Sequence, residues 1–319
     1  MGEQRPLFPI SIEGKWGYID AAGTVVIEPR FLSARDFSEG LAVVEIAGTS
    51  EEDRAFKRTY EGFIGPDGKF VIPPQPPAGI REIPGYDSYQ YSDFHEGLAR
   101  IHVNDASGMD GWIDRNGRLA IPPKFHSYGD FLEGLAYAET WRQWNRPGSQ
   151  KRGFINKQGK FVITNNDFRF GYSFSGGVAS VSMTFKGDDN AYCLIDKQGT
   201  FVIPPGVYAR IDAPENGAAV VAKNRKVGMV NKRGEVIVPL GLYDQIYGPW
   251  EPGKGRVFVA EKKGKTFVVD TMGKEVAEVP HPGHVSRFQE GMATVDQKGR
   301  YGYVDETGQG EKVSGTNGT

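Results

Sequence analysis

The sequence predicts an all-β protein built from about eight repeats of a hairpin-containing unit. Three observations support this prediction: a short phrase that returns eight times, turn residues at fixed places in the phrase, and β-branched or aromatic residues on both sides of each turn. The clearest copy, KWGYIDAAGTVVIEP, runs from Lys15 to Pro29. A unit that returns about every 40 residues is typical of propeller and solenoid arrays.

Each phrase is predicted to form a hairpin around an Asp or Asn and a Gly. Asp and Asn open a type I turn by bonding the backbone ahead of them, and Gly accepts the left-handed conformation that closes it. The acids and amides of this spacing are Asp20, Asp114, Asn156, Asp196, Asn231, Asp270 and Asp305, and the turn glycines are Gly23, Gly68, Gly117, Gly159, Gly199, Gly234, Gly273 and Gly308. Because Asn replaces Asp in two copies, turn formation explains the repeated acids better than catalysis or metal binding.

Two further strands per unit are expected. The dipeptide Glu-Gly, followed by an alternation with small residues, predicts a third strand after Glu39, Glu96, Glu133 and Glu290, and these glutamates are also interpreted as structural. The link that precedes each Glu-Gly, as at 31–37, is expected to supply a fourth, outer strand. Proline cannot donate to a strand ladder, so the second hairpin strand is predicted to end at Pro29, Pro73, Pro122, Pro204 and Pro239. No segment shows helical periodicity with caps, and the polar insertion 48–58 is interpreted as a solvated loop.

Four short strands in each unit match the blade of a β-propeller, so a closed propeller is favoured and an open β-solenoid is the alternative. A closed array would bring 7–18 into contact with 300–313, whereas an open array would keep these ends apart. We predict a single domain over 1–319 with units at approximately 7–37, 38–94, 95–131, 132–174, 175–213, 214–250, 251–288 and 289–313, followed by a flexible tail at 314–319.

Composition narrows the class of partner. The formal net charge is -2 with charges of both signs interspersed, which gives no reason to expect nucleic acid.

No apolar run is long enough for a membrane span or a signal peptide, and the single cysteine, Cys193, rules out an internal disulfide framework. A soluble, cytoplasmic protein is therefore favoured, with a secreted mature form as the alternative. No cofactor or metal is expected, because the pair His281 and His284 lacks a third ligand. A monomer is compatible with the sequence.

The phrase resembles the repeat of the bacterial WG-repeat proteins, also called KWG-repeat proteins. The resemblance rests on GKWGYIDAAG at 14–23, on the Val-Ile-x-Pro that follows, and on FSEGLA at 37–42, and it extends from Leu7 to about Lys312. The literal Trp-Gly pair occurs once, at Trp16 and Gly17. Elsewhere the pair becomes Glu61-Gly62, Asp110-Gly111, Arg152-Gly153, Val227-Gly228 or Tyr301-Gly302, and at Tyr192-Cys193 and Thr266-Phe267 the glycine is lost as well. The resemblance implies an interaction scaffold and brings no catalytic residues with it.

Insertions that interrupt the repeat are the predicted binding surfaces, because they add surface that the core does not require. The first is 140–147, where Trp141, Arg142, Trp144 and Arg146 are the residue types enriched at binding hot spots. The alternative is that these tryptophans fold back and cover the array. The second is the link 75–93, whose tyrosines either pack as an outer strand or line a ligand surface. The tyrosines concerned are Tyr86, Tyr89 and Tyr91.

The function favoured by these patterns is a non-enzymatic scaffold whose loops bind a protein partner. A carbohydrate-binding protein is one alternative, since exposed Trp and Tyr can stack on sugar rings. A hydrolase or lyase that gathers acids at the central channel of a propeller is the other. No Gly-x-Ser-x-Gly elbow and no phosphate loop appear in the sequence, so an enzyme is the less favoured class.

Overall fold

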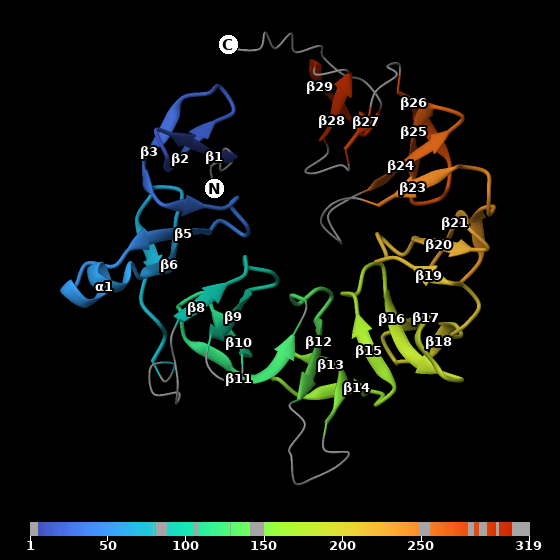
Figure 1. The fold of residues 1–319 in the computed structure, drawn as a ribbon, viewed down its shortest axis with the longest axis horizontal. Coiled ribbons are helices and arrows are strands. Elements are labelled where there is room, and N and C mark those ends of the chain that lie inside the picture. Colours follow the sequence, from blue (N-terminus) through green and yellow to red (C-terminus); the bar gives the residue numbers. More distant parts are fainter. Residues whose placement is uncertain are drawn as a thin grey trace, which may run out of the picture. The chain divides into compact units, whose positions relative to one another are not determined.

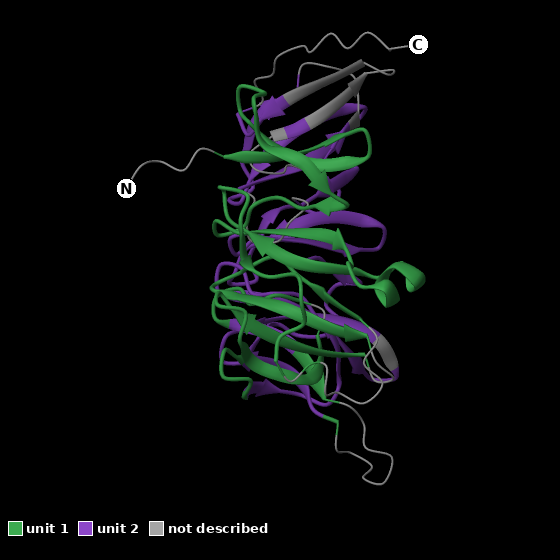
Figure 2. Cartoon of the chain, turned by 90° about the vertical axis from the view of Figure 1, so that its left-hand side faces the viewer, with its two compact units in different colours: residues 1–134, 138–150, 156–160 green, residues 135–137, 151–155, 161–319 purple. Residues whose placement is uncertain are grey.

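The computed structural model describes residues 6–78, 80, 88–104, 108–127, 129–140, 150–248, 256–279, 284–286, 292–297 and 300–307. The chain forms two compact units, coloured separately in Figure 2. Unit 1 comprises 1–134, 138–150 and 156–160, and unit 2 comprises 135–137, 151–155 and 161–319. Both consist of antiparallel sheets whose strands follow one another in chain order (Figure 1), which confirms the all-β prediction. The single-domain prediction stays a prediction.

Unit 1 contains three sets of strands. The first set is β1 (Leu7–Ile12), β2 (Lys15–Asp20) and β3 (Val25–Phe31). The second is β4 (Ser33–Ala34), β5 (Ala42–Ala47), β6 (Thr59–Ile64) and β7 (Phe70–Ile72). The third is β8 (Ser88–Tyr91), β9 (Leu98–Asn104), β10 (Met109–Asp114) and β11 (Leu119–Ser127), and the end of β11 pairs with the end of β12 (Leu135–Thr140), a strand that the two units share.

Unit 2 continues the same order. It contains the pair β13 (Arg152–Asn156) and β14 (Phe161–Thr164), followed by sheets of three or four strands. These are β15 (Phe168–Gly171), β16 (Val178–Phe185), β17 (Asp188–Asp196) and β18 (Phe201–Ile203); β19 (Arg210–Ile211), β20 (Ala219–Lys223), β21 (Lys226–Val230) and β22 (Val236–Val238); β23 (Gln245–Tyr247), β24 (Val257–Lys262), β25 (Lys265–Asp270) and β26 (Glu275–Glu278); and β27 (His284–Val285), β28 (Met292–Gln297) and β29 (Arg300–Asp305).

The predicted third and fourth strands of the repeat are present. In the set β4 to β7, for example, β5 is the strand after Glu-Gly and β4 is the outer strand formed by the link. The prediction that proline ends the second hairpin strand is confirmed at β7, β18 and β22. It is wrong at β3 and β11, which continue past Pro29 and Pro122. At each proline the pairing of the strand with its partner shifts register, and such an irregularity tolerates a residue that has no N–H.

A steric requirement explains why the glycine of the Trp-Gly pair recurs. In five repeats of the described chain a Cβ at this glycine would strike the backbone of the next strand, and at Gly17 and Gly111 the strand pairing shifts register at this point. The distance from such a Cβ to the facing carbonyl oxygen would be 2.6 Å at Gly111, 2.8 Å at Gly62 and 2.6 Å at Gly228, and closer still at Gly17 and Gly153. Side chains almost never approach a backbone atom so closely, and the glycine is therefore the required member of the pair.

The Asp and Asn residues of the hairpins cap their turns as predicted. Asp114 Oδ1 accepts hydrogen bonds from the backbone N–H of Asn116 and of Arg118, each at 2.9 Å. The same two bonds form at Asp20, Asn156, Asp196, Asn231 and Asp270. The acids at these turns accordingly have a structural role.

Exchange of Asp114 tests this role. Asp114→Ala is expected to lower the free energy of unfolding by about 1 kcal/mol, because two exposed hydrogen bonds are lost. Asp114→Asn should leave stability nearly unchanged, since the amide oxygen can accept the same bonds, as it does at Asn156. Thermal unfolding of both variants measures the difference. Equal losses for Asn and Ala would show that the charge, and not the turn, is what matters.

The repeated Glu-Gly dipeptides form tight turns that bond one repeat to the next. Glu39 and Gly40 both have positive φ, of 52° and 79°. The Glu39 carboxylate accepts hydrogen bonds from the backbone N–H of Glu96, at 2.6 Å, and of Gly97, at 3.0 Å. Glu96 in turn accepts from the N–H of Gly134 at 2.9 Å. The structural interpretation of Glu39 and Glu96 is therefore correct.

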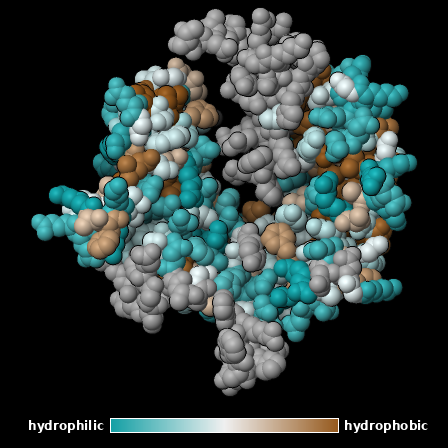
Figure 3. Space-filling view, in the orientation of Figure 1, coloured by the Kyte–Doolittle hydropathy of each residue, from teal (hydrophilic) through white to brown (hydrophobic). Residues whose placement is uncertain are grey.

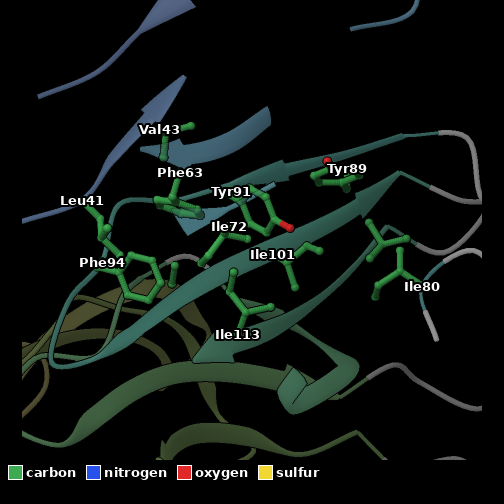
Figure 4. Close-up of a cluster of buried hydrophobic side chains, with 12 residues drawn as sticks. Leu41, Val43, Phe63, Ile72, Ile80, Tyr89, Tyr91, Phe94, Ile101 and Ile113 are labelled. Atoms are coloured by element: carbon green, nitrogen blue, oxygen red, sulfur yellow. The ribbon is translucent and has the colours of Figure 1, made fainter. Parts of the chain in front are cut away.

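Between successive repeats lie buried aromatic and aliphatic side chains. Figure 4 shows one such cluster, in which Phe63 lies beside Tyr91 and Phe94. The ring centroids are 5.0 Å and 4.7 Å apart, respectively. Single exposed apolar residues remain on the second hairpin strands, such as Val26, Val71 and Val236, and hydrophilic and hydrophobic residues are interspersed on the face in Figure 3. Such scattered residues are normal for a protein surface.

Cys193 is fully buried in β17, and burial raises the pKa of its thiol to about 12. Since the thiolate is the reactive form, we expect native protein to react very slowly with a thiol reagent at about pH 8. Protein unfolded in guanidinium should release one thiol equivalent at once. Rapid labelling of the native protein would contradict this burial.

The insertion between β5 and β6 differs from its prediction as a loop. It contains α1 (Glu51–Phe56), which begins with a capping box formed by Ser50 and Asp53. The helix buries none of its residues, so the expected solvation is correct although the backbone is helical. With six residues, α1 is too short to cross a membrane, and no helix in the described part of the chain could do so.

Candidate functional site

A polar pocket of about 580 Å3 lies within unit 1. Its walls come from the segment after β4, from the end of β8 and the residues after it, and from β9, β10 and the end of β11. Every described lining residue except Gly108 carries a hydrogen-bonding side chain. Ligand pockets of this size are usually lined by apolar residues, so this one is unusual in its chemistry.

Asp110 lines the pocket and is 3% exposed. Its Oδ1 lies 2.8 Å from Arg100 Nη1 and 3.0 Å from His102 Nδ1, and its Oδ2 accepts a hydrogen bond from the backbone N–H of Ser127 at 2.8 Å. Because a carboxylate only accepts, His102 Nδ1 carries a hydrogen, and in the neutral ring Nε2 is then an acceptor. Asp110 thereby fixes the orientation of both Arg100 and His102.

Arg35, the second guanidinium that lines the pocket, is held in a similar way. Its Nη1 donates to the backbone oxygen of Tyr91 at 2.6 Å, and its Nη2 forms an ion pair of 3.1 Å with Glu61 Oε1. The second oxygen of Glu61 accepts from the N–H of Tyr91 at 2.6 Å. Burial nevertheless raises the pKa of Glu61 above its ordinary value, against the opposing effects of this hydrogen bond and of Arg35. Carboxylates thus support both guanidinium groups of the pocket.

Two of these carboxylates occupy the first position of the repeat pair. Glu61 precedes Gly62 and Asp110 precedes Gly111, where the first repeat has Trp16. The strand register shows which residues of another repeat stand at the same positions. Val227 precedes Gly228 as Asp110 precedes Gly111, and Val227 pairs with Ala222 as Asp110 pairs with His102. Arg100 likewise corresponds to Val220. The scaffold can therefore build these three positions from Val220, Ala222 and Val227, two of which belong to a buried cluster.

The remaining acids of the pocket are half-buried. Asp93 Oδ1 lies 3.9 Å from Arg35 Nη1, and Asp130 Oδ2 lies 3.6 Å from His95 Nε2. Among the described residues no group of three or more His, Cys, Asp and Glu side chains is arranged to hold a metal ion. The geometry of the pocket is that of hydrogen-bonded recognition, with donors and acceptors fixed by buried carboxylates.

Four segments of the chain match the family model described as WG containing repeat: residues 16–49, 111–140, 153–183 and 192–226. The chain contains WG repeats. The predicted resemblance is thus confirmed for the repeat itself. The second matched segment begins at Gly111, directly after Asp110, which lines the pocket.

Comparison with solved structures concerns the fold of this WG-repeat chain. A eukaryotic initiation factor matches with a TM-score of 0.51 and 11% identity, over 96% of this chain and 84% of that one. AztD from Citrobacter koseri matches at 0.46 and 11%, over 97% and 93%. A prolyl endopeptidase matches at 0.48 and 14%, over 97% of this chain and 50% of that one. The first of these supports the all-β class and nothing about activity. Closure into a propeller stays a prediction, and no curated protein matches the sequence.

Most of the predicted site residues of the WG-repeat chain lie outside the described part of the structure. These are Trp141, Arg142, Trp144, Arg146 and Tyr86. Tyr89 and Tyr91 are described, and both are buried in β8, where their ring centroids are 5.0 Å apart. This placement corresponds to the outer-strand alternative. Tyr91 also borders the pocket, but a ring that is 2% exposed offers no platform for stacking on a ligand.

Sequence reasoning missed Arg100, His102 and Asp110 as candidates. It sought function in insertions, whereas these residues stand at ordinary strand positions of the repeat. One signal was available in the sequence: the position that Trp16 holds in the first repeat is held by an acid in two others, at Glu61 and Asp110. Each acid precedes the glycine at which the strand packs closely against the next strand. A charged residue at such a position is costly to bury and is an indication of function.

Proposed function

We propose that this WG-repeat chain is a non-enzymatic binding scaffold and that the unit 1 pocket is its recognition site for a polar ligand. A single observation carries the proposal: at three register-matched positions where one repeat has Val220, Ala222 and Val227, the pocket has Arg100, His102 and Asp110. Burying an ion pair in place of apolar side chains often lowers stability or leaves it unchanged. Folding alone therefore gives no reason for the polar set, and binding does.

The experiment compares the native chain with a matched variant, Arg100→Val/His102→Ala/Asp110→Val, which copies the apolar repeat. Thermal shift is measured against a panel of neutral sugars, free amino acids, dicarboxylates, polyamines and nucleotides. Because a ligand of the folded state stabilises it by RT ln(1 + [L]/Kd), a binder at about 100 times its Kd adds about 2.7 kcal/mol. At least one class should stabilise the native chain and not the variant. If no probe distinguishes the two proteins, the pocket is not a recognition site.

A second candidate, acid–base catalysis, has one specific observation in its favour. Asp110 orients His102 through Nδ1, an arrangement that leaves Nε2 placed to accept a proton from a bound group. The described pocket supports binding more directly, because the other lining groups act as hydrogen-bond donors and acceptors. Conversion of any ligand found in the panel, followed by chromatography and lost in His102→Gln, would replace the non-enzymatic proposal with this one.

A protein partner bound through 140–147 remains the proposal that rests on the sequence alone. Trp141→Ala/Trp144→Ala is expected to abolish capture of that partner from the native host while the melting temperature changes by less than about 2 °C, as for exposed residues. A loss of stability comparable to that of a core truncation would instead show that the two tryptophans cover the array.

A further inference from the structure

The pocket contains charges of both signs at close range. Its walls include two guanidinium groups and three carboxylates, and Glu61 adds a further carboxylate behind Arg35. Each guanidinium already has an acid beside it: Arg100 lies 2.8 Å from Asp110, and Arg35 lies 3.1 Å from Glu61 and 3.9 Å from Asp93. A ligand with a single charge would approach an attractive and a repulsive group together, and its net electrostatic gain would be small.

Hydrogen-bonding capacity nevertheless remains in the pocket. Arg100 uses Nη1 to bind Asp110, and its side chain is 29% exposed, so the guanidinium has further N–H donors near solvent. His102 Nε2 is an acceptor while the ring is neutral. Gln90, at the exposed edge, adds an amide with two donors and an acceptor. Donors and acceptors therefore line the same pocket.

A hydroxyl group fits a lining that contains both donors and acceptors, because each hydroxyl donates one hydrogen bond and accepts two. A ring that carries several hydroxyls can meet guanidinium, imidazole, amide and carboxylate at once without bringing an uncompensated charge into the pocket. We infer that the ligand of the unit 1 pocket is a neutral polyhydroxylated molecule, a mono- or disaccharide or the end unit of a glycan. This inference rests on the proposed function and names its ligand class.

The fixed geometry strengthens the inference. Three hydrogen bonds hold Asp110, and two backbone groups of Tyr91 hold the Arg35 and Glu61 pair. Tyr18 Oη also donates to the backbone oxygen of Arg35 at 2.7 Å. Side chains that are ordered before the ligand arrives lose little entropy when it binds. The pocket volume of about 580 Å3 lies within the range of small-molecule sites.

Three matched series of probes test the ligand class: neutral hexoses and their disaccharides, the corresponding amino sugars, and the corresponding uronic acids. Rings of one size that differ in charge separate hydrogen bonding from ionic attraction. In calorimetric titration we expect a neutral sugar to bind at least about tenfold more tightly than its charged counterparts, a difference of about 1.4 kcal/mol. Its Kd should change less than about twofold between about 0.05 and 0.5 M NaCl, because exposed charge interactions are the ones that salt screens. The triple variant Arg100→Val/His102→Ala/Asp110→Val should not bind it.

Tighter binding of an amino sugar or a uronic acid, with a Kd that rises with salt, would overturn the inference. Equal binding of the neutral sugar to the native chain and to the triple variant would overturn it as well, since the sugar would then be held elsewhere. If amino acids, dicarboxylates or polyamines bind the native chain alone and no sugar does, the recognition site stands and its assigned ligand class is wrong. If no probe distinguishes native chain from variant, the proposed function fails together with the inference.

Discussion

Replacing Gly111 by alanine is expected to lower the free energy of unfolding by about 3 kcal/mol or more, the upper range for overpacking in an interior. The added Cβ would lie 2.6 Å from the backbone oxygen of Ile121 and 2.8 Å from the backbone nitrogen of Pro123. Both atoms belong to the backbone of β11, so no rotation of a side chain can relieve the clash. Chemical denaturation followed by tryptophan fluorescence measures the loss, since Trp112 adjoins the substituted residue and is fully buried.

The control for Gly111 is Gly97, a glycine with the opposite requirement. Gly97 has a φ of +81° and open space where an added Cβ would lie, with no atom within 4 Å, whereas Gly111 is not among the residues with positive φ. Gly97→Ala therefore tests backbone strain alone, at a cost of about 1–2 kcal/mol. A smaller loss at Gly111 than at Gly97 would contradict the steric account of the Trp-Gly pair.

The difference between these glycines shows what the sequence could predict about the fold. Hairpins, their order and the turn glycines follow from local chemistry, because Asp20 and Gly23 are close enough along the chain to form the turn by themselves. The reason for Gly17 does not follow from local chemistry. Its Cβ would meet the β3 backbone from Ile27 onward, at the place where the pairing of β2 and β3 shifts register. The sequence shows that the glycine recurs, but the steric reason is found only in the structure, where the neighbouring strand lies against it.

The site was less predictable for a similar reason. Asp110 and Arg100 are ten residues apart in sequence and belong to β10 and β9, but Ser127 and Arg35 come from segments more distant along the chain. Sequence spacing contains no information on which charged residues of separate repeats share one space. Comparison of repeats within the chain supplies that information in part, because it identifies positions at which one copy is apolar and another is charged.

A second large effect on stability is expected from replacing Asp110. Its size should depend on whether Arg100 and His102 are replaced as well. Asp110→Val alone is expected to lower the free energy of unfolding by about 2–3 kcal/mol, because the buried N–H of Ser127 loses its acceptor and Arg100 loses its ion pair. The loss should fall below the roughly 3–5 kcal/mol typical of a fully buried pair, since Arg100 retains some contact with water. The stability of Asp110→Asn should lie between those of the native chain and Asp110→Val, as an amide keeps one acceptor and has no charge.

Restoring the apolar set should reverse most of this loss. In the triple variant Arg100→Val/His102→Ala/Asp110→Val, no charge is left without a partner, and the three positions repeat the chemistry of Val220, Ala222 and Val227. We expect its stability to come within about 1 kcal/mol of the native chain, the remaining loss being due to the backbone N–H of Ser127, which still lacks its acceptor. Denaturation of the single, double and triple variants gives the coupling between the three residues. A triple variant less stable than Asp110→Val would show that the polar set is needed for folding, and these residues would then give no indication of a recognition site.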